Sequence, residues 1–435
     1  MTSDGGGERA RTTADAVARR SYGKLVAFLA ARTRDVAAAE DALAEAFAAA
    51  LSDWPRKGSP ANPEAWLLTA ARRKLIDFAR RRQSGETAAA DLQILITTHD
   101  DPPDILTQGC EIPDNRLALM FACAHPAIDA GIRAPLILQV VLGLDAAAIA
   151  SAFLMSPTTM GQRLVRAKNK IRQAGIPFSI PDRTVLGDRL ATVLDAIYAA
   201  FAEGWTDPAG TDPARRDLSV EALFLGRLVT ELLPDEPEAL GLLSLMLHAD
   251  ARRRARRDEV GEYVPLAEQN PALWDAEMID EAERLLWRAS RLLTTEPTGR
   301  ELNSEPTARL SVGRFQLEAA LQSAHAHRRR SGVANWEAVV QLYDALHHLS
   351  PSPVVAINRA LAVAELHGPK LALEELDQLA ADTRLKEYQP YWAARAELLA
   401  KTGGGAEARA AYSIAIGLER DPAVRRFLQK RQASV

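Results

Sequence analysis

Hydrophobic residues recur along this chain at steps of three and four, which is the spacing of one face of an α-helix. Four apolar side chains mark such a face between residues 157 and 171: Met160, Leu164, Ala167 and Ile171. Ser156 is a good N-cap because its hydroxyl can accept a hydrogen bond from a first-turn amide, and Pro157 suits the next position, where no donor is needed. The pattern predicts a helix that begins at residue 157 and buries one stripe against a core.

A shorter apolar segment, residues 147–153, precedes this helix and leaves only two residues for the turn. Its small side chains allow close packing at a steep angle, so the pair is typical of a helix-turn-helix element. In such an element the N-terminal half of the second helix enters the major groove and contacts base edges and phosphates. The candidate DNA-binding side chains on the polar face are Thr158, Thr159, Gln162, Arg163, Arg166 and Lys170. The alternative is an amphipathic hairpin with a solvated basic face.

Helical periodicity also dominates the rest of the chain, so we expect an all-α fold. A strongly helical segment covers residues 35–51, and Asn62 and Pro63 start another that ends in a dense cationic run. Amphipathic segments continue from residue 182 to about residue 300. Trp66 lies beside the cationic run, where it could stack on a splayed base or fill a core.

The last third contains an internal repeat. Ala360 and Ala394 lie 34 residues apart, and other alanine and leucine positions recur at the same interval. This period is typical of tetratricopeptide helix pairs, which stack into a solenoid. Four polar residues are either candidates for its concave surface or simply exposed: Asn358, Arg359, Tyr391 and Arg395.

Composition and charge narrow the class of protein. With 435 residues and 47% hydrophobic content, the chain is long enough for two to four globular units. No apolar run is long enough to cross a bilayer, the N-terminal residues lack an apolar signal core, and only two cysteines are present. We therefore expect a cytoplasmic protein without a membrane partner.

The net charge of −4 hides an uneven distribution. Residues 15–83 are net basic, residues 84–113 contain six Asp or Glu and no Lys or Arg, and residues 114–181 contain seven Lys or Arg and three Asp or Glu. The remainder is net acidic. Two basic modules on either side of an acidic linker are what DNA contact by the first half requires, because phosphates attract cations.

The order of these motifs resembles one known family. The sequence AEDALAEAF at 39–47 is followed by NPEAWLLTAARRKLIDFARR at 62–81, an acidic linker, and GLDAAAIASAFLMSPTTMGQRLVRAKNKI at 143–171. This arrangement resembles the extracytoplasmic-function class of bacterial RNA polymerase sigma factors over about residues 15–181. The stretches at 201–205 and 233–253 are similar to a subgroup with a long helical, tetratricopeptide-like C-terminal extension.

The resemblance implies a domain plan. A disordered tail at 1–14 precedes sigma region 2 at 15–83, the acidic linker at 84–113 and sigma region 4, with its helix-turn-helix, at 114–181. A helical extension at 182–310 and tetratricopeptide-like repeats at 311–435 complete the plan.

The resemblance also implies two sets of binding residues in region 2. The set implied to bind core RNA polymerase is Glu40, Asp41, Glu45 and Phe47. The set implied to contact the downstream, minus-ten promoter element is Trp66, Arg72, Arg73, Lys74, Asp77, Arg80 and Arg81. The helix after residue 157 would contact the upstream, minus-thirty-five element. Two residues depart from the family pattern: Ala44 replaces a frequent glutamine, and Arg73 stands where many members have an asparagine that lines a base pocket.

Other candidate chemistry is weaker. Cys110, Cys123 and His125 supply at most three metal ligands without a paired knuckle, so we expect structural roles for them and no metal. The basic run at 252–257 ends an apolar helix and is either a nucleic-acid contact or a solvated, ion-paired face. No phosphate-binding glycine loop or nucleophile motif occurs, so we expect neither an enzyme nor a bound cofactor.

These observations lead to one main hypothesis and two alternatives. The main hypothesis is a sigma factor that binds core RNA polymerase and promoter DNA, with a C-terminal half that regulates it in cis or through a protein or peptide partner. The first alternative is a helix-turn-helix transcriptional regulator with a tetratricopeptide sensor domain that does not join polymerase. The second is a scaffold that assembles partners and ignores DNA.

Overall fold

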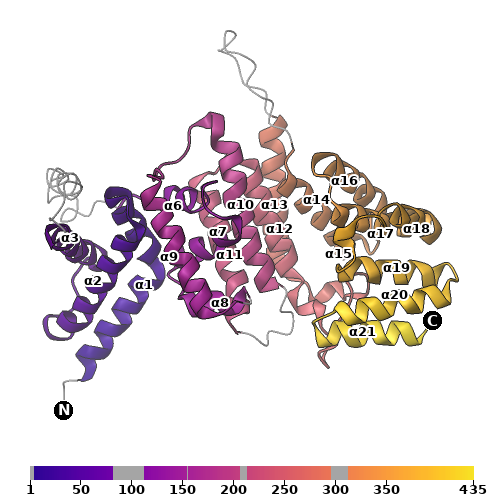
Figure 1. Ribbon diagram of the computed structural model, residues 1–435, viewed down its shortest axis with the longest axis horizontal. Coiled ribbons are helices and arrows are strands. Elements are labelled where there is room, and N and C mark those ends of the chain that lie inside the picture. Colours follow the sequence, from indigo (N-terminus) through magenta and orange to yellow (C-terminus); the bar gives the residue numbers. More distant parts are fainter. Residues whose placement is uncertain (1–3, 82–111, 154, 206–212, 295–311) are drawn as a thin grey trace, which may run out of the picture. The chain divides into compact units, whose positions relative to one another are not determined.

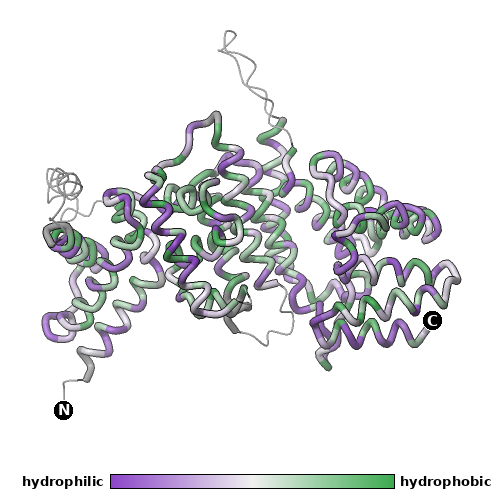
Figure 2. Tube along the Cα trace, viewed as in Figure 1, coloured by the Kyte–Doolittle hydropathy of each residue, from purple (hydrophilic) through white to green (hydrophobic). Residues whose placement is uncertain are grey.

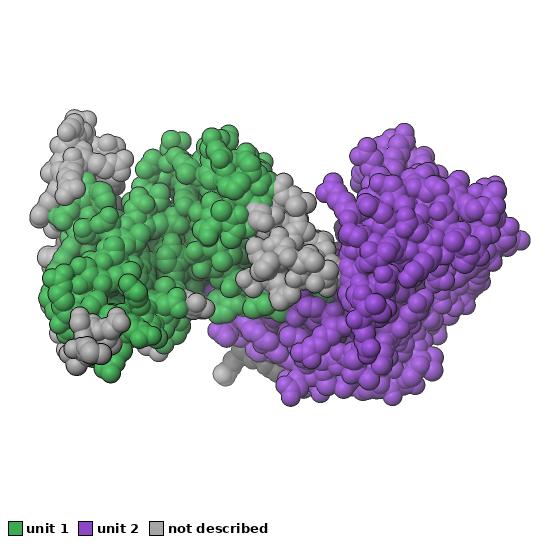
Figure 3. All heavy atoms as spheres, turned by 90° about the horizontal axis from the view of Figure 1, so that it is seen from below, with its two compact units in different colours: residues 1–206, 212–225 green, residues 207–211, 226–435 purple. Residues whose placement is uncertain are grey.

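The structure, a computed structural model, describes residues 4–81, 112–153, 155–205, 213–294 and 312–435 (Figure 1). These residues form α-helices and short 3-10 helices, joined by turns and one isolated bridge between Arg257 and Tyr263. The expected all-α fold class is confirmed. Two compact units divide the chain, one of residues 1–206 and 212–225 and the other of residues 207–211 and 226–435 (Figure 3).

The first unit is built from eight described helices and the first half of a ninth. They are α1 (Asp4–Thr33), α2 (Val36–Lys57), α3 (Pro63–Arg81), α6 (Arg116–Cys123), α7 (Ala130–Leu142), α8 (Ala146–Ala152), α9 (Pro157–Gln173), α10 (Arg183–Trp205) and α11 (Pro213–Leu232). Leu25 of α1, Leu43 of α2 and Leu67 of α3 are fully buried where these three helices pack together. In Figure 2 the hydrophobic residues follow one side of many helices, as the periodicity predicted.

The N-terminal residues differ from the expected disordered tail. Helix α1 starts at Asp4, and Ala10, Ala14 and Val17 are buried at steps of four and three. The segment contains three glycines but also alanines at helical spacing, so its apolar side has a surface to pack against. Packing therefore outweighs the low helix propensity of the first residues.

The second unit is centred on α12. Its helices are α12 (Pro237–Ala251), α13 (Ala276–Thr294), α14 (Arg314–Ala326), α15 (Arg328–Ser331), α16 (Trp336–Leu349), α17 (Pro353–His367), α18 (Pro369–Gln378), α19 (Gln389–Lys401), α20 (Gly405–Leu418) and α21 (Pro422–Ala433). Almost every residue of α12 is buried, because α13 and α14 both pack against it. Glu238 of α12 accepts hydrogen bonds from the amides of Phe315 (3.0 Å) and Gln316 (3.1 Å), so its carboxylate satisfies the N-terminus of α14.

The segment in which alanine and leucine positions recur every 34 residues forms helices α16 to α21. Ala360 of α17 and Ala394 of α19 are both buried, as are Ala362 and Ala396. Small residues at these positions allow neighbouring helices to approach closely.

Polar residues in this segment hold helices together. Arg359 bonds to Asp344 of α16 (2.6 Å) and to Glu375 of α18 (2.7 Å), and Arg395 is ion-paired with Asp377. Tyr391 is buried. Three of the four residues considered for a concave surface are therefore occupied by contacts between or within helices.

Candidate nucleic-acid and polymerase interface

Helix α9 has the boundaries and the buried stripe that its sequence predicts. Ser156 is the N-cap, and its hydroxyl accepts a hydrogen bond from the Thr159 amide at 3.1 Å. The four stripe residues identified from the sequence, from Met160 to Ile171, are all buried. Helix α8 ends shortly before, and its own N-terminus is capped by Asp145, which accepts from the amides of Ala147 and Ala148.

The opposite face of α9 presents most of the candidate DNA-binding residues. The exposed ones are Thr158, Thr159, Gln162, Arg166 and Lys170. The Thr159 hydroxyl also accepts a hydrogen bond from Ser156 at 2.7 Å, so it contributes to the cap. The face therefore combines hydroxyl, amide and cationic groups, which are the groups that bind phosphates and base edges.

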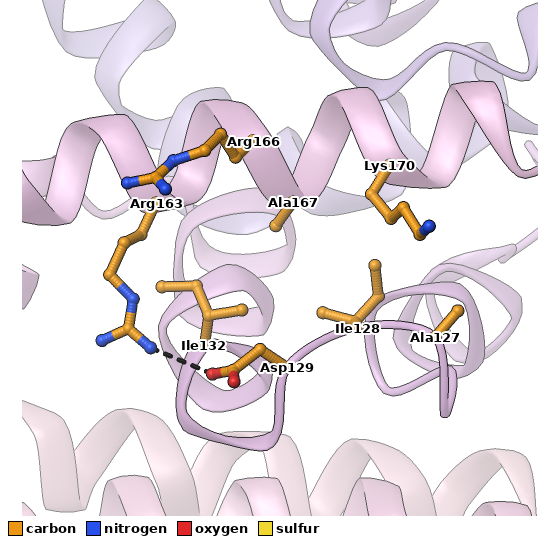
Figure 4. A pocket seen from close by; sticks show the side chains of 8 residues that line it. All are labelled: Ala127, Ile128, Asp129, Ile132, Arg163, Arg166, Ala167 and Lys170. Carbon is orange, nitrogen blue, oxygen red and sulfur yellow. Dashed lines mark hydrogen bonds and ion pairs between the residues drawn. The ribbon is translucent and has the colours of Figure 1, made fainter.

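Arg163, the remaining candidate, is engaged within the protein. Its guanidinium Nη2 donates to Asp129 Oδ1 at 2.9 Å, and its side chain is 32% exposed (Figure 4). Asp129 caps α7 by accepting from the Gly131 amide at 3.0 Å. The ion pair ties the middle of α9 to the start of α7 and holds Arg163 away from the direction that Arg166 takes.

A hollow of about 410 Å³ lies beside this ion pair. Its lining residues come from α9 and from the segment at the start of α7: Ala127, Ile128, Asp129, Ile132, Arg163, Arg166, Ala167 and Lys170. Four of these residues are apolar, three are cations, and Asp129 is paired with one of the cations, Arg163 (Figure 4). Arg166 and Lys170 give the lining a net positive charge, which is the sign that attracts phosphates.

Helix α3 carries the candidates for the downstream element. Trp66 is half-buried and meets Trp54 edge-on, with ring centroids 5.5 Å apart. The Arg72 guanidinium lies 5.2 Å from the centre of the Phe28 ring. Arg73 and Asp77 are exposed. Trp66 therefore packs against a neighbouring ring on one side and is partly exposed on the other.

Two more candidates, Arg80 and Arg81, are at the end of α3, where their side chains lie outside the described part of the structure. Lys74 is ion-paired with Glu45 of α2 at 3.2 Å. This exposed pair links one residue from the proposed DNA set with one from the proposed polymerase set. Surface pairs of this kind add little stability, so both groups remain accessible to a partner.

The four candidates for polymerase binding divide between two environments on α2. Asp41 and Glu45 are exposed, one turn apart. Phe47 is half-buried. Glu40 is largely covered: its Oε2 lies 2.6 Å from Lys168 Nζ of α9, and both side chains are only 13% exposed. Burial raises the pKa of Glu40, although the adjacent Lys168 opposes that change.

Several contacts of this region have no signal in the sequence. Lys168 and Arg172 of α9 pair with Glu40 and Asp35, and Asp129 pairs with Arg163. The first two pairs join residues 128 and 137 positions apart, so no local spacing points to them. The sequence shows only that these residues are carboxylates and cations next to apolar helix faces. It does not show which of them pair.

The residues considered for metal binding have other environments. Cys123 is fully buried, and burial raises the pKa of its thiol. His125 Nδ1 accepts a hydrogen bond from the Ala127 amide at 3.1 Å. Cys110 lies outside the described residues. Within the described ranges, no three His, Cys, Asp or Glu side chains are grouped so that they could hold a metal ion.

No helix in the described part of the chain is both long and apolar enough to span a membrane.

Comparison with known proteins identifies two segments. Residues 17–85 match the family Sigma-70 region 2, and residues 189–290 match a family of unknown function (DUF6596). An uncharacterized protein of Rhizobium meliloti (strain 1021) is 39% identical over 387 residues, which is 88% of this chain and 87% of that protein. No solved structure matches the chain.

The helical fold, the region 2 match and the full-length relative together define the class. The chain belongs to the sigma-70 family, as a member with a C-terminal extension, and it belongs to the same family as the Rhizobium meliloti protein. Sigma-70 proteins are non-enzymatic transcription initiation factors. Membership supports a role in polymerase-directed transcription and binding to core RNA polymerase.

Proposed function

We propose that this protein is a cytoplasmic sigma factor that directs core RNA polymerase to specific promoters through two DNA-binding helices. Helix α2 binds polymerase with Asp41, Glu45 and neighbouring residues, α3 contacts the downstream element, and α9 contacts the upstream element. The observation that carries this proposal is the exposed polar face of α9, present in a chain whose first module matches Sigma-70 region 2.

The chemistry of α9 supports contact with a major groove. Its N-terminal turn is capped and its apolar stripe is buried, so the helix is rigidly mounted with its polar side outward. Gln162 and Arg166 are one turn apart on that side, where each could make a bidentate contact to a base. Lys170 follows one turn later, at a position suited to a phosphate.

Run-off transcription with core polymerase on genomic DNA fragments tests this function. We expect the full chain to produce discrete transcripts, and Arg166→Ala to weaken promoter binding by about 5-fold to 150-fold, equal to about 1 to 3 kcal/mol for a lost base contact. Arg329→Ala removes the same charge from an exposed position on α15 and should bind like the wild type. Equal binding by the two variants, or no transcript from any fragment, would contradict the proposal.

The first alternative, a DNA-binding regulator that does not join polymerase, makes a different prediction. Such a protein needs neither the acidic exposed face of α2 nor a region 2 module. A pulldown of the full chain with core polymerase separates the two functions. Retention of core polymerase that is lost on Asp41→Lys, with no loss on the exposed Asp258→Lys, supports the sigma factor.

We further propose that the C-terminal half regulates this activity. A chain cut after residue 181 is a poor test, because α10 belongs to the first unit and Arg189 donates to the Phe121 carbonyl oxygen at 2.7 Å. A chain that ends after residue 235 keeps α10 and α11 whole. If its circular dichroism shows intact helices while its promoter activity and polymerase binding equal those of the full chain, regulation in cis is excluded.

A further inference from the structure

The second unit contains two runs of arginine, at residues 252–257 and 328–330, which follow the ends of neighbouring helices. The first run comes at the C-terminus of α12, and the second forms most of α15, directly after α14. Helix α12 packs against α14, and the 3-10 helix η4 (Pro271–Leu273) contacts both η2 (Arg253–Arg256) and α15. The fold therefore gathers cations from two distant segments of the sequence.

The arginines of the first run are not equivalent. Arg253 and Arg257 are ion-paired with carboxylates, and Arg254 is exposed. The run at 252–257 is therefore in part the ion-paired, solvated face that the sequence allowed. Arg252 belongs to neither group, because it is half-buried and its guanidinium donates to neutral groups of the protein.

Arg252 and Arg328 have only uncharged hydrogen-bond partners within the described ranges. Arg252 Nε donates to the His248 carbonyl oxygen at 3.3 Å, and its Nη2 donates to Gln322 of α14. The Arg328 guanidinium lies 5.4 Å from the centre of the Trp274 ring. It also donates to three carbonyl oxygens of the loop before η4, those of Leu266 (3.1 Å), Ala267 (2.8 Å) and Gln269 (2.9 Å). Neither of these two cations is balanced by an ion pair.

The two guanidinium groups are close enough to repel each other. Gln322, which accepts from Arg252, precedes Arg328 by six residues on the helical path from α14 to α15, a rise of about 9 Å. Burial, together with Arg256 and Arg328, lowers the pKa of Arg252 to about 10, so this group is still charged at neutral pH. Partly covered charges of one sign destabilise a fold unless an anion offsets them.

Buried polar atoms without a hydrogen-bond partner gather around the same two arginines. Among the described residues, nine buried side-chain nitrogen or oxygen atoms make no hydrogen bond, and five of the nine belong to residues 248–274. They include both ring nitrogens of His248, Gln269 Oε1 and Trp274 Nε1. These three side chains are only 1%, 6% and 4% exposed. Because buried polar groups are nearly always hydrogen-bonded, such a concentration indicates a place where a ligand provides partners.

Each of these three residues contacts one of the two arginines. His248 accepts from Arg252 through its backbone, Gln269 accepts from Arg328 in the same way, and the Trp274 ring lies under the Arg328 guanidinium. An arginine has five N–H donors, and the bonds above use two of them in Arg252 and three in Arg328. The region therefore combines positive charge with several free donors, among them the indole N–H.

We propose that the second unit binds a phosphate group, as free inorganic phosphate or as a small phosphate monoester, between Arg252 and Arg328, with His248 and Trp274 Nε1 as further donors. This site is independent of the proposed sigma factor function. Two guanidinium groups carry a charge of +2, and a phosphate monoester carries about −1.5 to −2 at pH 7, so one phosphate group balances both. Its oxygens also match the fork of N–H donors that a guanidinium presents.

A phosphate group bound in this position joins three segments of the second unit. Arg252 belongs to the end of α12, Arg328 to α15, and Trp274 to the loop between η4 and α13. A ligand that binds only the folded form stabilises that form by mass action. The stability of the second unit should therefore rise with the phosphate concentration, and the amides of α12 and α14 should exchange more slowly.

The full chain and four of its variants test the inference. Arg252→Gln removes one charge from the site, and Trp274→Phe keeps a buried ring beside Arg328 while it removes only the indole N–H. Arg254→Gln is the matched control for charge, since Arg254 belongs to the same run but is exposed. Trp54→Phe is the matched control for the indole, because Trp54 Nε1 is also buried and without a hydrogen-bond partner but lies in the first unit.

The dissociation constant for inorganic phosphate is measured by calorimetric titration in a phosphate-free buffer, with chloride added to keep the ionic strength constant. We expect Arg252→Gln to weaken binding at least about tenfold and Trp274→Phe at least about fivefold, because each loses a donor to a charged ligand. Arg254→Gln and Trp54→Phe should match the wild type. The same titration with glycerol phosphate distinguishes the two sources, since the ligand that binds more tightly is either the free ion or the monoester.

Hydrogen exchange with and without inorganic phosphate locates the site in the full chain. We expect slower exchange in peptides from α12, α14 and the loop at 257–275. Peptides from α9, whose cations are proposed to contact DNA phosphates, report any attraction of phosphate to the first unit. Protection confined to α9 would assign the binding to the proposed DNA surface and would overturn a site in the second unit.

Three other results would also overturn the inference. One is no binding of either phosphate compound by the wild type at millimolar concentration. Another is an equal loss of affinity in Arg252→Gln and Arg254→Gln, which would show a diffuse attraction to the arginine run. The third is wild-type affinity in Trp274→Phe. If circular dichroism shows that Arg252→Gln has lost helix, the comparison of Trp274→Phe with Trp54→Phe decides the question alone.

Discussion

Two histidines in the second unit should make that unit sensitive to acid. His248 of α12 is 1% exposed, and burial together with Arg252 and Arg330 lowers its pKa to about 3. Burial, with Arg252 and Arg328, lowers the pKa of His325 of α14 to about 4. Both imidazoles are therefore neutral in the folded protein at a pH where an unfolded chain would protonate them.

The size of the effect follows from these pKa values and the ordinary histidine value of 6.5. Both pKa values are lower in the folded protein than in the unfolded chain. The free energy of unfolding is therefore highest above pH 6.5, where both histidines are neutral in either state, and it falls as the pH decreases towards the folded pKa values. At about pH 5 each histidine costs about 2 kcal/mol, so the pair costs at most about 4 kcal/mol. Glu283 Oε1, 3.7 Å from His248 Nε2, already accepts from the Ser323 hydroxyl, so it offsets little of this cost.

The assay is urea unfolding of the full chain at about pH 7.5 and about pH 5, followed by a hydrogen-exchange pulse at one fixed pH. Peptides from α12 and α14 report the second unit separately from the first. The double variant His248→Gln with His325→Gln should lose about 4 kcal/mol less than the wild type between the two conditions. His367→Gln, at the exposed end of α17, is the matched control and should behave as the wild type. A double variant with the wild-type pH dependence would refute the reasoning.

Two further substitutions test the local structure. Ser156→Ala removes the acceptor for the Thr159 amide and should destabilise the first turn of α9 by about 1 kcal/mol, seen as faster amide exchange confined to that turn. Gly241→Ala places a Cβ 2.7 Å from the Gln316 backbone nitrogen of α14. That clash should outweigh the helix propensity gained and lower the stability of the second unit by about 1 to 3 kcal/mol in urea unfolding, whereas an unchanged or higher stability would show that α12 and α14 can move apart.

The sequence is sufficient to predict those structural features that depend on interactions between residues close together in the chain. The boundary at Pro157 and the buried stripe of α9 depend on a cap and on helical periodicity, and both act over a few residues. The all-α class follows from the same periodicity along the chain. The helix that begins at Asp4 was not predicted, because nothing in the local sequence shows the surface on which Ala10 and Ala14 pack.

Contacts between distant segments could not be predicted in this way. Nothing in the spacing of Glu40 or Lys168 shows that they meet, because their pairing depends on how α9 is carried against α2 by the packing of α1, α6 and α7. The same holds for Asp129, which caps α7 and also pairs with Arg163. Periodicity identifies the faces of a helix, but tertiary packing decides which face meets which partner.

Tertiary contacts also reduce the number of cations that the second basic module can offer to DNA. Residues 114–181 contain seven Lys or Arg, and the charge count alone does not show which of them are available to phosphates. Four of these cations are paired with carboxylates: Arg116, Arg163, Lys168 and Arg172. Arg133 donates to the backbone carbonyl oxygen of Ile128. The positive charge that α9 presents outward is therefore concentrated on Arg166 and Lys170. A cluster of cations in the sequence can therefore serve two purposes, attraction to DNA and ion pairing within the protein. The tertiary structure decides which cations serve which purpose, and a residue count does not show this.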